Sequence, residues 1–194
     1  MDLYFTSSRQ GFTLIEILIV LAISASMTGM VIVYSAASRD TVSLSVKTTE
    51  VAQSILRAKS LAVSTYSVTG QQRVCAYGVA FDPSANTFSM VSYVPPSGTS
   101  CSEANSVTGD EIISYGPSTW QMPIGPGVRL TTGGASLVLF YPPDPTTLLS
   151  GSSCVPGGDC TYTFLQVPMT VTFATTGGTS GAVTIGAAGQ VDVQ

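Results

Sequence analysis

Four cysteines are the most chemically distinctive residues of this chain: Cys75, Cys101, Cys154 and Cys160. Four thiolates could hold one zinc ion, but the spacing contains no Cys-x-x-Cys pair of the kind that zinc sites use. An even number of cysteines in an exported protein instead predicts two disulfides, for which three pairings are possible. We favour Cys154–Cys160, which closes a short loop, and by elimination Cys75–Cys101.

Residues that usually carry catalysis are scarce. The 194 residues include no histidine, which excludes Ser-His-Asp and Cys-His catalysis and any histidine-bound metal. Two acidic positions could serve a cation or proton transfer, namely the adjacent pair Asp110 and Glu111, and Asp144 between prolines. Their glycine and proline neighbours favour solvated turns instead. The sequence therefore predicts no enzyme, no catalytic residue, no cofactor and no metal.

The composition indicates a folded chain with few charges. Hydrophobic residues make up 44% of the sequence and charged residues only 9%, which excludes an intrinsically disordered protein. Seven basic residues against eleven acidic ones give a formal net charge of −4. Such a chain lacks a basic surface for phosphate groups. We therefore expect no nucleic-acid partner.

Positions 17–38 form an uninterrupted run of uncharged, mostly apolar residues. At about 1.5 Å per residue, a helix of this length crosses a hydrocarbon core of about 30 Å. Glu16 precedes this run inside the same apolar stretch, and a carboxylate in lipid costs a few kcal/mol unless it has a partner. A free amino group would supply that partner if the chain were cut just before Phe12.

The run Gly-Phe-Thr-Leu-Ile-Glu at positions 11–16 resembles the processing site of type IV prepilins and of type II secretion pseudopilins. The resemblance implies that a prepilin peptidase cleaves after Gly11 and methylates Phe12. Residues 1–11 would then be a leader. Glu16 would stand at the fifth mature position, where the family's acidic residue pairs with the amino terminus of a neighbouring subunit during assembly.

Two other interpretations of this segment are open. The first is an ordinary secretory signal peptide, with an apolar region at 14–23 and cleavage near Ser24. Glu16 inside that apolar region argues against it, as does Asp2, which offsets the charge of Arg9. The second is a membrane-anchored domain that never assembles, which the sequence does not distinguish from a filament subunit.

Positions 39–62 change from solidly apolar to amphipathic, which indicates a helix packed on a globular domain. We expect one long helix over 12–64, with 12–38 as the transmembrane and assembly segment. Two helices hinged near Ser38 are the alternative. The apolar positions expected on the helical face are Val42, Leu44, Val46, Val51, Ile55, Leu56, Ala58, Leu61 and Ala62.

Residues 65–194 have the alternating Val, Thr, Tyr and Phe content of short strands. Long polar loops are expected at 95–109 and 142–159, and a hairpin turn at 186–189. The fold class is therefore α+β: a type IV pilin fold, with one long N-terminal helix packed on an antiparallel β-sheet head. Strands are expected at 73–81, 87–93, 111–115, 128–131, 136–141, 169–175, 182–185 and 190–193.

Two stretches of the head, 137–145 and 183–191, resemble those of H-type pseudopilins and the related FimT-like minor pilins. Members of the FimT-like group that bind DNA use basic residues near the C-terminus. Here the last basic residue is Arg129, which argues against DNA capture.

The resemblance implies a structural subunit of a type IV pilus or pseudopilus filament, acting in motility, adhesion, secretion or DNA uptake. Its implied partners are identical or related pilin subunits, the prepilin peptidase and N-methyltransferase, the inner-membrane assembly platform, and the membrane. It would lie in the cytoplasmic membrane as a precursor and outside the cell as a filament. A tip adhesin or ligand-binding minor pilin, acting through loops 95–109 and 142–159, is the alternative.

Overall fold

The computed structural model describes residues 12–65, 74–96, 101, 106–115, 121–132, 136–142, 146–151, 154, 156–165 and 167–194. By its internal contacts the chain divides into two units, Met1–Arg39 and Asp40–Gln194. Helix α1 (Leu14–Thr65) supplies the described part of the first unit after Thr13, and it contributes one element to the second. No proline interrupts it, as a helix of this length requires. The helix is assigned as one element across Ser38, where a hinge was the alternative.

The described residues of the second unit contain one short 3-10 helix, η1 (Gly109–Glu111), and strands that pair antiparallel throughout. The fold class expected from the sequence, a long N-terminal helix with an antiparallel β-sheet head, is confirmed. The strands are β1 (Ala76–Asp82), β2 (Thr87–Tyr93), β3 (Ser106–Thr108), β4 (Ile112–Ser114), β5 (Gln121–Pro123), β6 (Val128–Thr132), β7 (Leu137–Tyr141), β8 (Thr146–Ser150), β9 (Thr161–Thr163), β10 (Met169–Thr175), β11 (Ser180–Ile185) and β12 (Val191–Val193).

These strands form a six-stranded sheet, a four-stranded sheet and a two-stranded sheet. The six-stranded sheet has the order β4-β2-β1-β7-β8, with β5 also paired to β2. Its central strand β1 pairs with β2 on one side and with β7 on the other. Nearly every residue of β1 and all of β7 are buried, because both faces of this sheet are covered.

The four-stranded sheet has the order β12-β11-β10-β6 and is covered on one face only. Burial alternates strictly along β10, with Val171 and Phe173 in the core and Thr170 and Thr172 on the other face. The hydroxyls of Thr170 and Thr184 lie 3.2 Å apart across β10 and β11. The outer face is thus lined by cross-strand threonine pairs.

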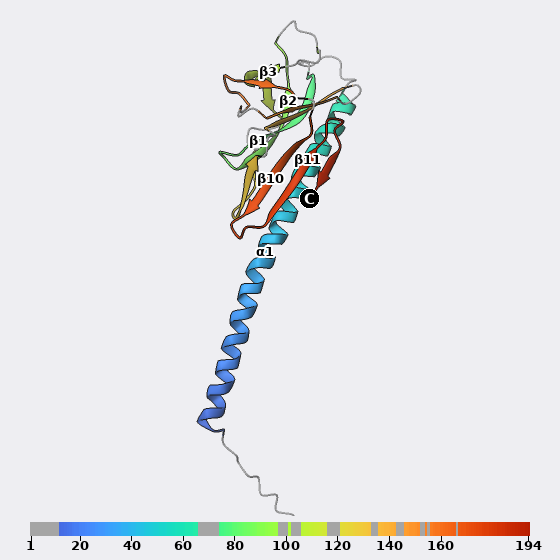
Figure 1. Ribbon diagram of the computed structural model, residues 1–194. Helices are drawn as coiled ribbons and strands as arrows, with labels where there is room; N and C mark the ends of the chain where they lie inside the picture. The colour runs from blue at the N-terminus through green and yellow to red at the C-terminus, as the bar shows by residue number, and fades with distance from the viewer. Residues whose placement is uncertain are drawn as a thin grey trace, which may run out of the picture. The chain divides into compact units, whose positions relative to one another are not determined.

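The main core joins both large sheets to the part of α1 that belongs to the second unit, beside which β10 and β11 run in Figure 1. The helix inserts Leu44, Val51, Ile55, Ala58 and Ala62 into it. These residues recur at spacings of three, four and seven, which place them on one face of a helix. This core holds the head together.

Several details differ from the sequence expectation. Val42, Val46 and Leu56 were expected on the packed face, but their side chains are 60, 56 and 52% exposed. Their spacing also fits a helix face, and the sequence pattern alone does not say which face the sheets cover. The expected loop 95–109 contains β3, and the expected loop 142–159 contains β8. Strands β5 and β9 were not predicted, because three-residue strands carry too little alternation.

Candidate functional site

The first unit presents a continuous apolar surface. Phe12 is 82% exposed and Leu14 77%, and every large apolar side chain from Phe12 to Tyr34 is more than half exposed. At about 25 cal/mol per Å² of apolar surface, leaving such a surface in water is costly. A contiguous apolar face of this size therefore marks a segment that contacts lipid or other protein chains.

Among the described residues, one helix, within the range Leu14–Ser64, is long and apolar enough to cross a membrane. A secretory signal sequence would meet the same criterion of length and composition. The feature that sets this helix apart is the carboxylate of Glu16 in its first turn. The chemistry of this segment therefore centres on Glu16.

Glu16 forms a capping box with Thr13. The backbone N–H of Thr13 donates to Glu16 Oε2 at 3.4 Å, and the Thr13 hydroxyl donates to the same oxygen at 3.3 Å. In return, the backbone N–H of Glu16 lies 3.3 Å from Thr13 Oγ1. This reciprocal arrangement satisfies N–H groups that a helix start otherwise leaves unpaired, and the helix dipole favours a negative charge there.

The role of Thr13 was not predicted, although the signal was present. The spacing Thr-x-x-Glu at positions 13–16 is the capping-box pattern that marks the start of a helix. From the sequence, this run was interpreted as a site of cleavage and methylation, with Glu16 as the acidic residue that pairs with a neighbouring subunit during assembly. The structure adds that the carboxylate of Glu16 also caps the helix.

Hydroxyl groups inside the apolar segment bond to the helix itself. Ser26 Oγ donates to the carbonyl of Ile23 at 2.8 Å, and Thr28 Oγ1 donates to the carbonyl of Ser24 at 2.7 Å. Such back-bonding lets a polar side chain enter a low-dielectric environment with a hydrogen bond already made. Both hydroxyls are thus compatible with a membrane or a helix bundle.

The remaining predicted residues of this segment stand as follows. Phe12 lies just before α1, and Gly11, with the rest of the expected leader 1–11, lies outside the described residues. The cleavage and methylation sites therefore stay predictions. Loops 95–109 and 142–159, proposed for ligand binding, lie partly outside the described residues too.

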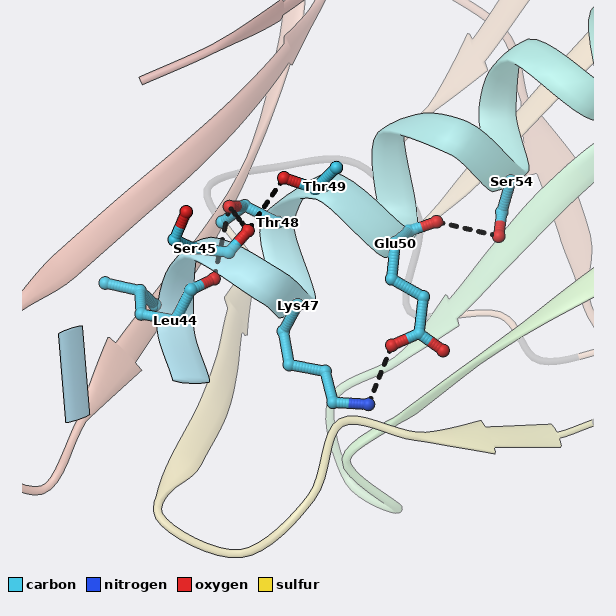
Figure 2. A network of polar contacts seen from close by, with 7 residues as sticks. All are labelled: Leu44, Ser45, Lys47, Thr48, Thr49, Glu50 and Ser54. Atoms are coloured by element: carbon cyan, nitrogen blue, oxygen red, sulfur yellow. Dashed lines mark hydrogen bonds and ion pairs between the residues drawn. The ribbon is translucent and has the colours of Figure 1, made fainter. Parts of the chain in front are cut away.

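The helical part of the second unit uses its polar side chains within the helix, as Figure 2 shows. Lys47 Nζ and Glu50 Oε2 form an ion pair of 2.7 Å. Buried Thr48 donates to the carbonyls of Leu44 and Ser45, each at 3.1 Å, and Ser54 donates to the carbonyl of Glu50 at 2.9 Å. These groups are paired locally, which lets α1 pack against the sheets without unpaired polar atoms there.

One contact ties α1 to the last hairpin of the head. Lys59 Nζ donates to the backbone carbonyl of Gly189 at 3.1 Å. Gly189 lies in the turn between β11 and β12, at the position where the sequence predicted a hairpin turn, and its N–H donates to the carbonyl of Gly186 at 2.8 Å. The positive φ of Gly189, 72°, suits glycine.

The cysteines form two disulfides, Cys75–Cys101 and Cys154–Cys160. These are the two pairs that were favoured from the sequence. The described residues contain no group of three or more His, Cys, Asp or Glu side chains placed to hold a metal ion.

The turn that follows β1 is built around the carboxyl of Asp82, whose pKa is shifted. Burial alone would raise the pKa of Asp82, but hydrogen bonds from the Ser84 hydroxyl and from the N–H groups of Ser84 and Ala85 outweigh it, so the pKa lies below its ordinary value. The Asp82 carboxylate therefore fixes the turn between β1 and β2.

Comparison with known proteins gives one match in sequence and one in structure. Residues 6–32 match the family described as the prokaryotic N-terminal methylation motif, which supports the resemblance to type IV pilins and pseudopilins. The structure is similar to that of the minor pseudopilin EpsH from the type 2 secretion system of Vibrio cholerae, with a TM-score of 0.45 and 12% identity. That match covers 78% of this chain and 95% of EpsH. A sequence search of curated proteins found no match.

Proposed function

We propose that this chain, which carries the N-terminal methylation signal of type IV pilins and pseudopilins, is a structural subunit of a type IV pilus or pseudopilus filament. The precursor lies in the cytoplasmic membrane through residues 12–38. A prepilin peptidase removes residues 1–11 and methylates the new terminus at Phe12. The subunit then leaves the membrane and joins a helical bundle of pilin subunits on the assembly platform.

The observation that carries this proposal is the position of Glu16 in the first turn of an exposed apolar helix that starts at Leu14, three residues after Gly11. All the bonds described for the Glu16 carboxylate use Oε2, which accepts from Thr13. A carboxylate has two oxygens and about four acceptor positions. Oε1 would therefore accept from the ammonium group of a neighbouring subunit while the cap stays intact.

The surroundings of that pair determine what it contributes. Apolar side chains from Leu14 to Tyr34 are exposed in the single chain, and burying them between helices replaces lipid contacts with protein contacts. In such an environment an unpaired carboxylate is costly, and pairing it with an ammonium group offsets part of the cost of desolvation. Glu16 thus sets the register between neighbouring subunits, because the bundle is favourable only where each carboxylate meets an amino terminus.

The experiment that tests the proposal measures the intact mass and the N-terminal peptide of the protein from cell envelopes and from a sheared surface fraction. We expect a sheared form that begins at Phe12 and carries one added methyl group. A start near Ser24 in either fraction would mean an ordinary signal peptide. An uncut chain confined to the envelope would mean a membrane anchor, and the filament proposal would be wrong.

A further inference from the structure

The six-stranded sheet buries two separate hydrophobic clusters, one on each face. Along β1, Val79 and Phe81 belong to the main core, whereas Ala76 and Ala80 belong to the second cluster. Residues one apart on a strand point to opposite faces of a sheet. The second cluster therefore lies on the face that α1 does not cover.

A thin layer covers this second face. We call it the outer layer, and it consists of β3, η1, β9 and the disulfide-linked residues around them: Cys101, residues 106–111, Cys154 and residues 156–164. Its two strands pair over three residues each. Among its described residues, the buried members of the second cluster are Val107, Cys154 and Tyr162, and Phe164 is partly buried against them. A layer with so few buried apolar side chains has low local stability.

Both disulfides hold this layer. Cys75 precedes β1 and is bonded to Cys101 of the layer, 26 positions away in sequence. The bond between Cys154 and Cys160 closes a loop of sequence separation 6 that ends one residue before β9. The described residues of the main core include no cysteine. The covalent links of the head are thus concentrated on its thinnest part.

The loop closed by Cys154–Cys160 lies directly against Gly109 of η1. The N–H of Gly109 donates to the carbonyl of Cys160 at 2.7 Å, and the N–H of Gly157 donates to the carbonyl of Gly109 at 2.8 Å. A Cβ at Gly109 would lie 2.3 Å from the carbonyl oxygen of Gly158, so only glycine allows this contact. The contact between η1 and the loop closed by Cys154–Cys160 therefore depends on the shape of that loop.

The largest side chain of the layer also weakens it. Tyr162 is fully buried, and its hydroxyl has no hydrogen-bond partner among the described residues. A buried hydroxyl without a partner lowers stability, because water would have bound it in the open form. The apolar contribution of Tyr162 is thus partly cancelled.

We propose that the outer layer is a redox-controlled flap. It stays closed on the six-stranded sheet while both disulfides are intact. When they are reduced, it opens while the rest of the head stays folded. A dithiol reductant supplies two electrons and two protons to each disulfide, which becomes two thiols while the dithiol becomes a disulfide. The main core, which α1 forms with both large sheets, keeps its structure in the opened form. The flap would consequently close only after export to an oxidising compartment, and a reduced precursor would lack its surface.

The test is hydrogen exchange, followed by mass spectrometry, on the oxidised full-length chain in detergent micelles before and after reduction with a dithiol. We expect peptides over 106–111 and 156–164 to exchange faster after reduction, while a peptide over 169–175 keeps its rate. The chain-entropy estimate for the loops gives roughly 50-fold for loss of Cys154–Cys160 and roughly 400-fold for loss of Cys75–Cys101. The paired substitutions Cys154→Ser and Cys160→Ser isolate the smaller effect.

Tyr162→Phe is the matched variant, because it removes only the unpaired hydroxyl. In the oxidised protein it should slow exchange over 156–164 by roughly tenfold. If reduction accelerates exchange over 169–175 as much as over the flap peptides, the disulfides hold the whole head, and the proposal is overturned. Unchanged exchange over 106–111 after complete reduction would overturn it as well. Since reduction is applied to protein that is already folded, neither outcome depends on refolding.

Discussion

The side-chain carbonyl of Asn86 accepts a hydrogen bond of 2.8 Å from the backbone N–H of Leu130. The amide nitrogen of the same side chain donates to the carbonyl of Val128 at 2.9 Å. Asn86 lies in the turn between β1 and β2 of the six-stranded sheet, and Val128 and Leu130 lie on edge strand β6 of the four-stranded sheet. One amide thus binds the free edge of one sheet to a turn of the other.

Replacing Asn86 should loosen the junction between the two sheets. Asn86→Ala removes two hydrogen bonds of about 1 kcal/mol each and places alanine at a φ of 54°, which costs about 1 kcal/mol more. We expect a loss of about 2–3 kcal/mol in the free energy of unfolding, measured by chemical denaturation. Asn86→Gly is the control for the backbone term, and it should lose only the hydrogen-bond part. Equal losses of stability in Asn86→Ala and Asn86→Gly would show that the backbone conformation does not contribute to the cost.

Gly189→Ala should be costly for two reasons that can be separated. The new Cβ would lie 2.5 Å from Thr147 Oγ1, and the residue has a φ of 72°. Gly127 has a φ of 86°, and a Cβ added there would meet nothing within 4 Å, so Gly127→Ala carries the backbone term alone. We expect a loss of about 1 kcal/mol at Gly127 and of about 2–4 kcal/mol at Gly189, both measured by chemical denaturation.

A second substitution identifies the clash at Gly189. Thr147 is buried, and its hydroxyl has no hydrogen-bond partner among the described residues. Thr147→Ala removes that hydroxyl, so combining it with Gly189→Ala should recover part of the lost stability. A double-mutant cycle with no coupling would show that the contact between Thr147 and Gly189 is not the cause.

Glu16→Gln and Thr13→Val separate the two roles of the N-terminal carboxylate. Glutamine can still occupy the third position of a capping box but carries no charge, whereas valine removes the cap and keeps the charge. If the ion pair sets the register of the bundle, Glu16→Gln should leave the protein in the membrane and reduce sheared filaments at least about tenfold. Thr13→Val should reduce filament yield much less. Yields are compared by immunoblot of the sheared fraction at equal envelope content, and normal filaments from Glu16→Gln would contradict the assembly role.

Acid should weaken the turn at Asp82. Its pKa in the folded protein lies below the value near 3.9 of an unfolded chain, so its contribution is present above that value and is lost as the pH falls through the folded pKa. Asp82→Asn should therefore be less stable than the natural chain at pH 6. The difference should close as the pH falls below the pKa of Asp82 in the folded protein. Thermal unfolding of both proteins from pH 6 downward measures this difference. A stability difference that does not change with pH would show that the charge of the Asp82 carboxylate is not its cause.

The elements with a clear sequence pattern were predictable, and those defined by distant partners were not. The long apolar run and the alternation along 169–175 were enough to predict α1 and β10. Strand β8 has its two leucines side by side, Leu148 in the second cluster and Leu149 in the main core, so both of its faces are covered and its sequence shows no period of two. Strands β3 and β9 exist because they pair with each other across a long stretch of chain.

The candidate site shows the same division. The charge of Glu16 and its position after Gly11 were visible in the sequence, and so was the Thr-x-x-Glu spacing that was overlooked. The bond between Asn86 and β6 was not visible, because it depends on how a turn of one sheet approaches the edge of another. The exposed positions Val42, Val46 and Leu56 were also beyond prediction, since amphipathicity does not say which side a sheet will cover.

The contrast between β1 and β10 sets how the head tolerates sequence change. In a complete single-substitution scan, tolerance along β10 should alternate, with polar and bulky residues accepted at Thr170 and Thr172 and rejected at Val171 and Phe173. Along β1 the tolerance should not alternate, because both faces of this strand are covered. Variation among natural variants of this head would then accumulate on one face of the four-stranded sheet, while the central strand of the other sheet admits little change.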